Sequence, residues 1–141
     1  MEGINMLLSL LNRKEKLKFL DLAMHMVAVD GEPTAYEQRI LNMMLAEVGD
    51  GIVKEYTFSL SKDLEETIKY FDDCSQPVKH ICYLNLLRLT MFDDLYNTLE
   101  HFFLEDIRQR FLITELKKKQ LMRLVYNERD LKERAKRLVN H

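Results

Sequence analysis

The amino-acid sequence predicts an all-α protein, a compact bundle of about seven helices that forms one domain over residues 1–141. Hydrophobic residues make up 47% of the 141 residues, which is enough to bury a single core. The chain has only four Gly and two Pro, whereas a sandwich or barrel of short strands needs many turn residues. Apolar residues recur at helical spacing along most of the chain, and no pair of alternating segments predicts a hairpin.

Three helical segments are expected before residue 50. Residues 4–11 are apolar and predict a short first helix that docks on the core. Residues 17–29 are apolar on nearly every side, which is typical of a buried central helix, and the Asp-Gly pair that follows is expected to end it. Pro33 and Thr34 then start an amphipathic helix that continues to the next glycines.

The second part of the chain is expected to continue in helices. Residues 52–60 contain β-branched and aromatic residues, but a strand without a partner is unstable, so an irregular turn or a short helix is expected. Ser61 and Thr114 are suitable N-cap residues. Helices are expected over residues 61–71, 78–92, 98–112 and 114–139, and the second of these is apolar on nearly all sides.

Two parts of the chain are similar when the sequence is shifted by 63 residues. Residues 15–50 and 78–113 each contain a buried helix, an acidic turn, and a Glu in the first turn of an amphipathic helix. The shift aligns Glu37 with Glu100, Ile40 with Phe103, Leu41 with Leu104, Met44 with Ile107 and Val48 with Phe111. The repeated helix type and register predict a duplicated helical hairpin with a pseudo-twofold axis.

Residues 20–48 read LDLAMHMVAVDGEPTAYEQRILNMMLAEV and resemble the first motif of the TerB-like family. That family is named for a tellurite-resistance protein, and related domains occur in a membrane-anchored J-domain co-chaperone. Its motif is an apolar helix, Asp-Gly-Glu, a turn and a Glu that starts the next helix; the matching residues are Asp30, Gly31, Glu32 and Glu37. The resemblance covers about residues 15–125 and implies an all-α fold with an internal repeat, a metal-binding acidic cluster, and a role in stress or tellurite resistance.

The second acidic motif of the family corresponds here to Asp93 or Asp94 together with Glu100. This half departs from the pattern, because Asp94 and Leu95 stand where the first half has Gly and Glu. The departure removes one possible ligand and leaves open which of the two aspartates points into the cluster.

These acids form a candidate metal site, because carboxylate oxygens suit hard cations such as Ca²⁺, Mg²⁺ or Mn²⁺. The candidate ligands are Asp30, Glu32, Glu37, Asp93, Asp94 and Glu100. A cation would relieve the repulsion between like charges if the pseudo-twofold brings the two turns together. The spacing is not that of an EF-hand, since the twelfth residue counted from Asp30 is Leu41.

A structural alternative explains the two glutamates without a metal. Thr34 and Glu37 have the spacing of a capping box, and Asn97 with Glu100 has a weaker version of it. The aspartates of the two turns are then ordinary helix-end residues. Both interpretations stay open at the level of sequence.

The charges divide the chain into an acidic body with basic ends. The net charge is +2 over residues 1–18, −9 over residues 19–114 and +5 over residues 115–141, for a total of −2. Nucleic-acid binding is not expected, because the lysines at 117–119 form a short run without interleaved aromatic residues. No apolar run approaches about 18 residues, and two Cys without an evident signal peptide predict a reducing, cytoplasmic setting.

The remaining residues with reactive side chains have structural interpretations. Cys74, His80 and Cys82 match no common zinc spacing, and Cys82 is expected to be a buried thiol. His25 lies four residues after Asp21 on the same helix face, which predicts a pair within the helix. The sequence contains no glycine-rich phosphate loop and no nucleophile-elbow motif.

Together the patterns predict a non-enzymatic module that senses or buffers a divalent cation through its acidic cluster and contacts a protein partner. The alternative is a metal-free adaptor that binds a protein through its helical surface or through the basic residues 115–141. A hydrolase that uses carboxylates and a metal is the least favoured, because little beside the acids could bind a phosphate substrate. The oligomeric state is left open.

Overall fold

The computed structural model describes residues 5–29, 31–56, 63–91 and 98–141, and this part of the chain contains helices and no strand. The α-helices are α1 (Arg13–Val27), α2 (Ala35–Val48), α3 (Asp50–Glu55), α4 (Leu64–Tyr70), α5 (Gln76–Met91), α6 (Thr98–Arg110) and α7 (Glu115–Asn140). Two short 3-10 helices join them, η1 (Leu8–Leu10) and η2 (Phe71–Asp73). The prediction of an all-α bundle is therefore confirmed.

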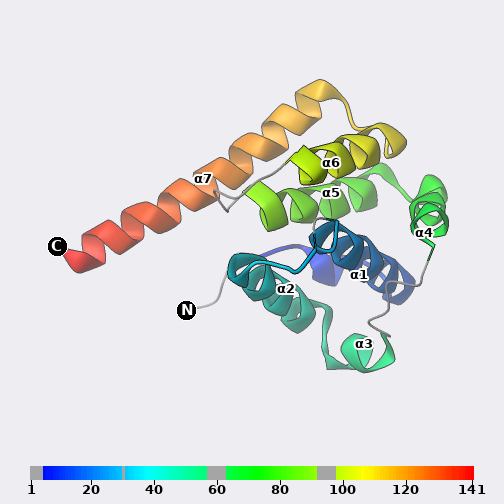
Figure 1. Ribbon diagram of the computed structural model, residues 1–141, viewed down its shortest axis with the longest axis horizontal. Helices are drawn as coiled ribbons and strands as arrows, with labels where there is room; N and C mark the ends of the chain where they lie inside the picture. The colour runs from blue at the N-terminus through cyan, green and yellow to red at the C-terminus, as the bar shows by residue number, and fades with distance from the viewer. Residues whose placement is uncertain (1–4, 30, 57–62, 92–97) are drawn as a thin grey trace.

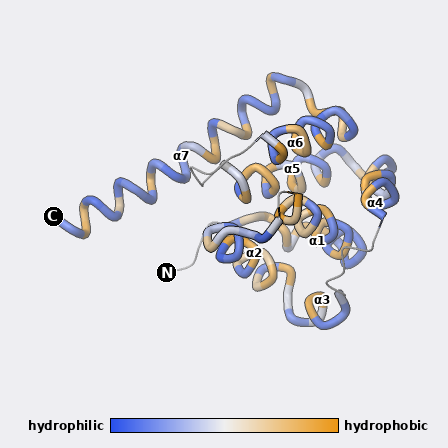
Figure 2. Tube along the Cα trace, in the orientation of Figure 1, coloured by the Kyte–Doolittle hydropathy of each residue, from blue (hydrophilic) through white to orange (hydrophobic). Residues whose placement is uncertain are grey.

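Helix α5 lies at the centre of the fold. It contacts α1 and α2 on one side and α6 and α7 on the other (Figure 1). Every residue from 82 to 90 is buried, as expected for a helix that is apolar on nearly all sides. The hydrophobic residues of Figure 2 accordingly gather where α1, α2, α5 and α6 face each other.

The helix starts follow the expected cap chemistry. Thr34 is the N-cap of α2 and Thr114 is the N-cap of α7, each accepting a backbone hydrogen bond through its side chain. Helix α1 begins earlier than expected, because Asn12 and Glu15 form a capping box ahead of the apolar run. In the expected segment 52–60, residues 52–55 belong to the short helix α3, which is one of the two expectations, and residues 57–60 lie outside the described residues.

Two helix ends differ from the expected ones. Helix α1 ends at Val27, earlier than the expected end at the Asp-Gly pair, and Gly31 in the connection that follows has a left-handed φ of 116°. The helix expected over residues 61–71 starts later, because Asp63 is the N-cap of α4 and accepts a hydrogen bond from the N–H of Glu65. Ser61, the expected cap, lies outside the described residues.

The prediction of a helix over residues 4–11 is wrong for the described part of this segment, which forms only the short turn η1. The carboxylate of Glu47 accepts hydrogen bonds from the backbone N–H groups of Met6 and Leu8, at 2.9 and 2.7 Å. Leu7 between them has a left-handed φ of 62°, which no α-helix accommodates. Met6 and Leu8 are buried, so the segment docks on the core as expected but in an irregular conformation.

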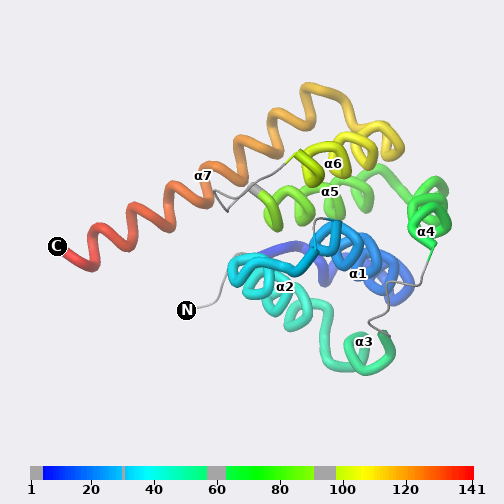
Figure 3. Tube along the Cα trace, viewed as in Figure 1, coloured from blue at the N-terminus to red at the C-terminus, as the bar shows by residue number. Residues whose placement is uncertain are grey.

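Helix α7 is the longest element, with 26 residues and a length of about 39 Å. Its first half packs against α5, and its C-terminal half extends away from the bundle (Figures 1 and 3). Every residue from 130 to 141 is exposed. No helix in the described part of the chain has both the length and the apolar composition to cross a membrane.

The internal repeat stays a prediction. Its two glutamates, Glu37 and Glu100, are both buried, and so are three of the four aligned apolar pairs, which lie on α2 and on α6 with the residue that follows it. In the fourth pair Ile40 is buried and Phe103 is only partly buried.

Candidate functional site

The six predicted metal ligands are only partly described by the structure. Three of them lie outside the described residues, namely Asp30, Asp93 and Asp94. Glu32 is exposed, whereas Glu37 and Glu100 are each 4% exposed in the first turns of α2 and α6. Within the described residues no three His, Cys, Asp or Glu side chains are arranged to hold a metal ion.

Glu37 has a defined structural role in the cap of α2. Its backbone N–H donates to Thr34 Oγ1 at 3.0 Å, and its Oε1 accepts from the Thr34 N–H at 2.9 Å. These two bonds form the capping box that the sequence indicated, so the structural interpretation of Glu37 is confirmed. Asn97, the expected cap partner of Glu100, lies outside the described residues.

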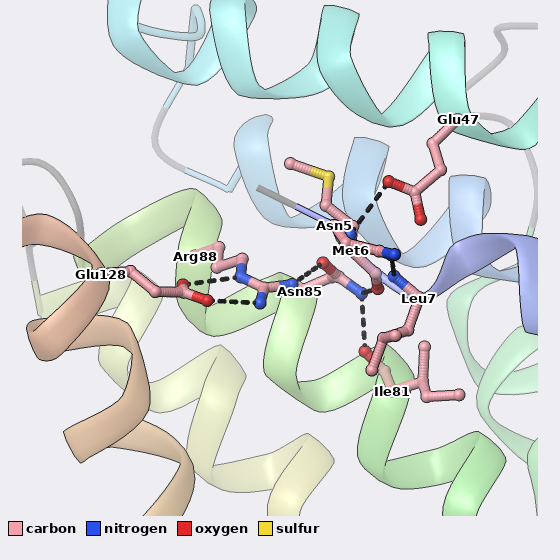
Figure 4. A network of polar contacts seen from close by, with 8 residues as sticks. All are labelled: Asn5, Met6, Leu7, Glu47, Ile81, Asn85, Arg88 and Glu128. Carbon is pink, nitrogen blue, oxygen red and sulfur yellow. Dashed lines mark hydrogen bonds and ion pairs between the residues drawn. The ribbon is translucent and has the colours of Figure 1, made fainter. Parts of the chain in front are cut away.

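A buried polar network is centred on Arg88, a residue of α5 that is only 3% exposed (Figure 4). Its Nε and one terminal nitrogen donate to the two carboxylate oxygens of Glu128, at 3.0 and 2.7 Å. This two-point geometry is the strongest form of an arginine–carboxylate pair. Because Glu128 belongs to α7, the pair fixes the long helix to the centre of the bundle.

Asn85 extends this network to the N-terminal segment (Figure 4). Its Oδ1 accepts a hydrogen bond from Arg88 at 2.8 Å. Its amide nitrogen donates to the carbonyl oxygens of Met6 and Ile81, at 2.8 and 2.9 Å. One continuous chain of hydrogen bonds therefore joins the N-terminal segment ahead of η1 to α5 and α7.

A second set of ion pairs holds the start of α7 against α6. Glu105 accepts hydrogen bonds from Arg108 and from Lys118, and Arg108 also pairs with Glu115 at 3.1 Å. Partial burial opposes ionisation of Glu105, but the bonds from Lys118 and Arg108 outweigh it and hold the pKa of this carboxyl below its usual range. The carboxylate stays charged and keeps the two helices together at neutral pH.

A cleft of about 270 Å³ opens between α5, α6 and α7. It is lined by Tyr83, Leu87, His101, Leu104, Glu105, Lys118, Met122 and Tyr126. The charges of Glu105 and Lys118 neutralise each other at its edge. Its volume is below the roughly 300–1,000 Å³ that is typical of small-molecule sites, so it suits one large side chain better than a substrate.

The free half of α7, residues 130–141, carries an unusual set of apolar side chains. Leu131 is 64% exposed and Leu138 is 73% exposed, and Leu124 lies one heptad before them in a partly exposed position. Seven residues advance about 700° around an α-helix, which is about 20° short of two full turns. These three leucines therefore lie almost on one line along the surface of α7. We call them the leucine stripe of α7. Figure 2 shows that the projecting part of α7 is mostly hydrophilic, with short hydrophobic stretches between the hydrophilic ones.

Two further sequence predictions concern buried reactive groups. Cys82 is fully buried, as predicted, and its burial raises the pKa of the thiol. Asp21 is buried on α1 and accepts a 2.6 Å hydrogen bond from the hydroxyl of Tyr56. Burial, together with this bond, raises the pKa of Tyr56 well above its usual range. The expected pairing of Asp21 with His25 stays a prediction.

Sequence reasoning missed the residues that position α7. Asn85 and Arg88 are the polar exceptions near the end of an apolar helix, separated by three residues, and that spacing places them on one face. An arginine within an apolar helix needs a carboxylate partner when it is buried, and this need was the one signal in the sequence for an ion pair at Arg88. The partner, Glu128, is 40 residues away and looks like an ordinary surface residue of a charged helix.

The comparisons with known proteins identified no relative of this chain. No family model matches the chain, and neither the curated proteins nor the solved structures compared with it give a match. The TerB-like resemblance therefore rests on the residues of the acidic motif alone, and the function has to be argued from the geometry of this chain.

Proposed function

We propose that the protein is a non-enzymatic interaction module in which the helical bundle is a rigid mount and the free half of α7 docks to a protein partner. The observation that supports this most is the combination of a buried anchor with an exposed apolar stripe on one helix. Arg88 and Glu128 hold α7 at its middle, and Leu131 and Leu138 follow directly beyond that anchor.

Helix α7 buries some of its apolar side chains and exposes others. A helix that serves only the fold buries its apolar side chains and exposes its charged ones. Here Val125 is fully buried, while the leucines that continue the helix are exposed at heptad spacing. Burying one such leucine in an interface contributes about 1.5–3 kcal/mol, so two or three of them are a substantial docking element.

Photo-crosslinking from defined positions on α7 tests this proposal. A photoreactive residue replaces Leu131 or Leu138 in the full chain, expressed at native level in its own cells. The matched control replaces Glu133, which lies on the opposite side of the helix because two residues advance about 200°. Discrete adducts from the two leucine positions and none from position 133 support docking through the stripe. No adduct from either leucine position overturns it.

A second candidate function is the divalent-cation sensor that the acidic motif predicts. The observation that favours it is that Glu37 and Glu100, the two glutamates that the acidic motif aligns, are both buried in the first turns of their helices. Ca²⁺, Mg²⁺ or Mn²⁺ at 100 times its dissociation constant is expected to stabilise the fold by about 2.7 kcal/mol. Thermal unfolding of metal-stripped protein measures this shift, and Asp30→Asn combined with Asp93→Asn is the control that removes it. If no cation raises the melting temperature of the wild-type protein, the sensor hypothesis is wrong.

A further inference from the structure

We infer that the partner of the leucine stripe is a second copy of this chain, and that two α7 helices pair antiparallel with the two Leu131 side chains at the centre. This inference rests on the proposed function, because it names the occupant of the same stripe. Three features of the described residues carry it: the spacing of the leucines, the charges beside them, and the position of the body along α7.

The leucines are symmetric about Leu131. Leu124 lies seven residues before it and Leu138 lies seven residues after it. In an antiparallel pair centred on Leu131, Leu124 of one copy is therefore at the same height as Leu138 of the other. Each leucine of the stripe then meets a leucine of the second copy, and all three are removed from water.

The charges beside the stripe are complementary in this arrangement. Each residue advances about 100° around the helix, so Asp130 and Arg134 lie on one side of Leu131. When the second helix runs in the opposite direction, Asp130 of one copy lies within about 3 Å of the height of Arg134 of the other, on the same side of the contact. The twofold axis generates this ion pair twice.

The other side of the stripe has the same property. Glu128 and Lys132 flank Leu131 there, and the antiparallel arrangement brings Glu128 of one copy near Lys132 of the other. Glu128 is already bonded to Arg88, so Lys132 adds to an existing pair. In a parallel pair each side of the stripe faces the opposite side of the second copy. Glu128 then lies nearest Asp130 of the second copy and Arg134 lies nearest Lys132, and both of these contacts are between like charges. Charge therefore selects the antiparallel pair.

The body of the protein leaves room for this contact. The side of α7 that packs on the bundle carries Val125 and Met122, which lie about 120° and 180° around the helix from Leu131. An antiparallel pair also places the two bodies at opposite ends of the paired segment. Leu131 and Leu138 lie within the exposed residues 130–141, and Leu124 is 43% exposed, so the described part of the chain leaves most of the contact uncovered.

A charge-reversal experiment on the full chain tests the arrangement. Asp130→Arg places two arginines on that side of each helix, and Arg134→Asp places two aspartates there. Each single variant replaces two attractions by two repulsions across the twofold axis, and its dimer dissociation constant is expected to rise about tenfold or more. A mixture of the two variants restores opposite charges and is expected to form a mixed dimer. The double variant is expected to dimerise like the wild type.

Sedimentation velocity over a range of protein concentrations measures these equilibria, and circular dichroism verifies that every variant is folded. Lys136→Glu, on the opposite side of the helix from the stripe, is the control that leaves the dimer unchanged. A wild-type protein that stays monomeric at several hundred micromolar overturns the inference. So does equal dimerisation of the single variants, because the antiparallel register requires their repulsion.

The two proposals fail in different ways. If the protein is monomeric and crosslinks from Leu131 to a chain of another mass, the docking function stands and self-pairing is wrong. If a monomer binds vesicles of phosphatidylcholine and phosphatidylserine through the stripe, self-pairing is also wrong and the partner is a lipid surface. An adduct of twice the chain's mass, together with rescue in the mixture, supports both.

Discussion

Val125 and Val139 lie on the same helix and have the same side chain, yet the first is fully buried and the second is 84% exposed. Residues 115–128 of α7 are held by ion pairs to α5 and α6, whereas residues 130–141 are all exposed. The boundary between the two halves is Glu128, the anchor to Arg88. The comparison shows that each of these two valines is buried or exposed according to its position before or after this anchor, and not according to its residue type.

Removing the anchor is expected to have the largest effect. Arg88→Met leaves the carboxylate of Glu128 without its two donors in a mostly buried place, and the expected loss of stability is about 3–5 kcal/mol. Urea unfolding followed by circular dichroism measures it. The matched change in the free half, Lys136→Met, is expected to alter stability by less than about 0.5 kcal/mol. Equal losses for the two variants would contradict the proposed difference between the halves.

The two valines give a smaller and cleaner contrast. Val125→Ala removes two buried methyl groups and leaves a cavity, so it is expected to cost about 2 kcal/mol. Val139→Ala removes the same groups from water and is expected to cost almost nothing in the monomer. Thermal unfolding at low protein concentration compares the two variants directly. A loss above 1 kcal/mol for Val139→Ala would mean that the free half packs on something within one chain.

The contact of the N-terminal segment with α2 is expected to rank next. Glu47→Gln retains an oxygen for one of the two backbone N–H groups and offers a donor to the other, and the expected cost is about 1–2 kcal/mol. Hydrogen exchange is the sharper measurement, because the amides of Met6 and Leu8 should lose protection while those of α5 keep it. Unchanged exchange at Met6 and Leu8 would show that the carboxylate does not hold this segment.

The smallest expected effect is a pH dependence located at His80. Partial burial, and then the charge of Lys117 in the docked half of α7, lower the pKa of this imidazole from its ordinary value of 6.5. A folded-state pKa below the unfolded one stabilises the fold above about pH 6.5, and this contribution is lost as the pH falls through the lowered pKa. The stability curve of His80→Gln between pH 7 and 5 is therefore expected to be flatter than that of the wild type. NMR titration of the ring checks the shift, and a pKa of 6.5 or above would refute it.

The sequence predicted local features well and long-range ones poorly. Thr34 and Thr114 were identified as caps because the signal lies within one helical turn, and α5 was identified as buried because its apolar residues cover every side. The helix predicted for the N-terminal segment was wrong because the backbone of this segment is hydrogen-bonded to Glu47, some 40 residues away. A hydrophobic pattern records which residues avoid water, but it does not record which backbone groups a distant carboxylate binds.

The candidate site shows the same limit. The capping box of Glu37 was recognised from its spacing, and the predicted metal cluster stays a prediction because three of its aspartates lie outside the described residues. Arg88 and Glu128 were not recognised, since neither spacing nor local composition connects two residues on different helices. The leucine stripe was present in the sequence as a seven-residue period, but only the structure shows that the body of the protein leaves it uncovered.

The Arg88–Glu128 pair also sets an order in which a newly synthesised chain can fold. Residue 128 is synthesised 40 residues after its arginine, a delay of roughly 2–8 s at ordinary rates of translation. During this interval Arg88 lacks its carboxylate partner, so burial of Arg88 with α5 is unfavourable. Burial of α5 and attachment of α7 to it therefore occur together, after residue 128 has been synthesised. A chain truncated before residue 128 has neither the buried α5 nor the attached α7.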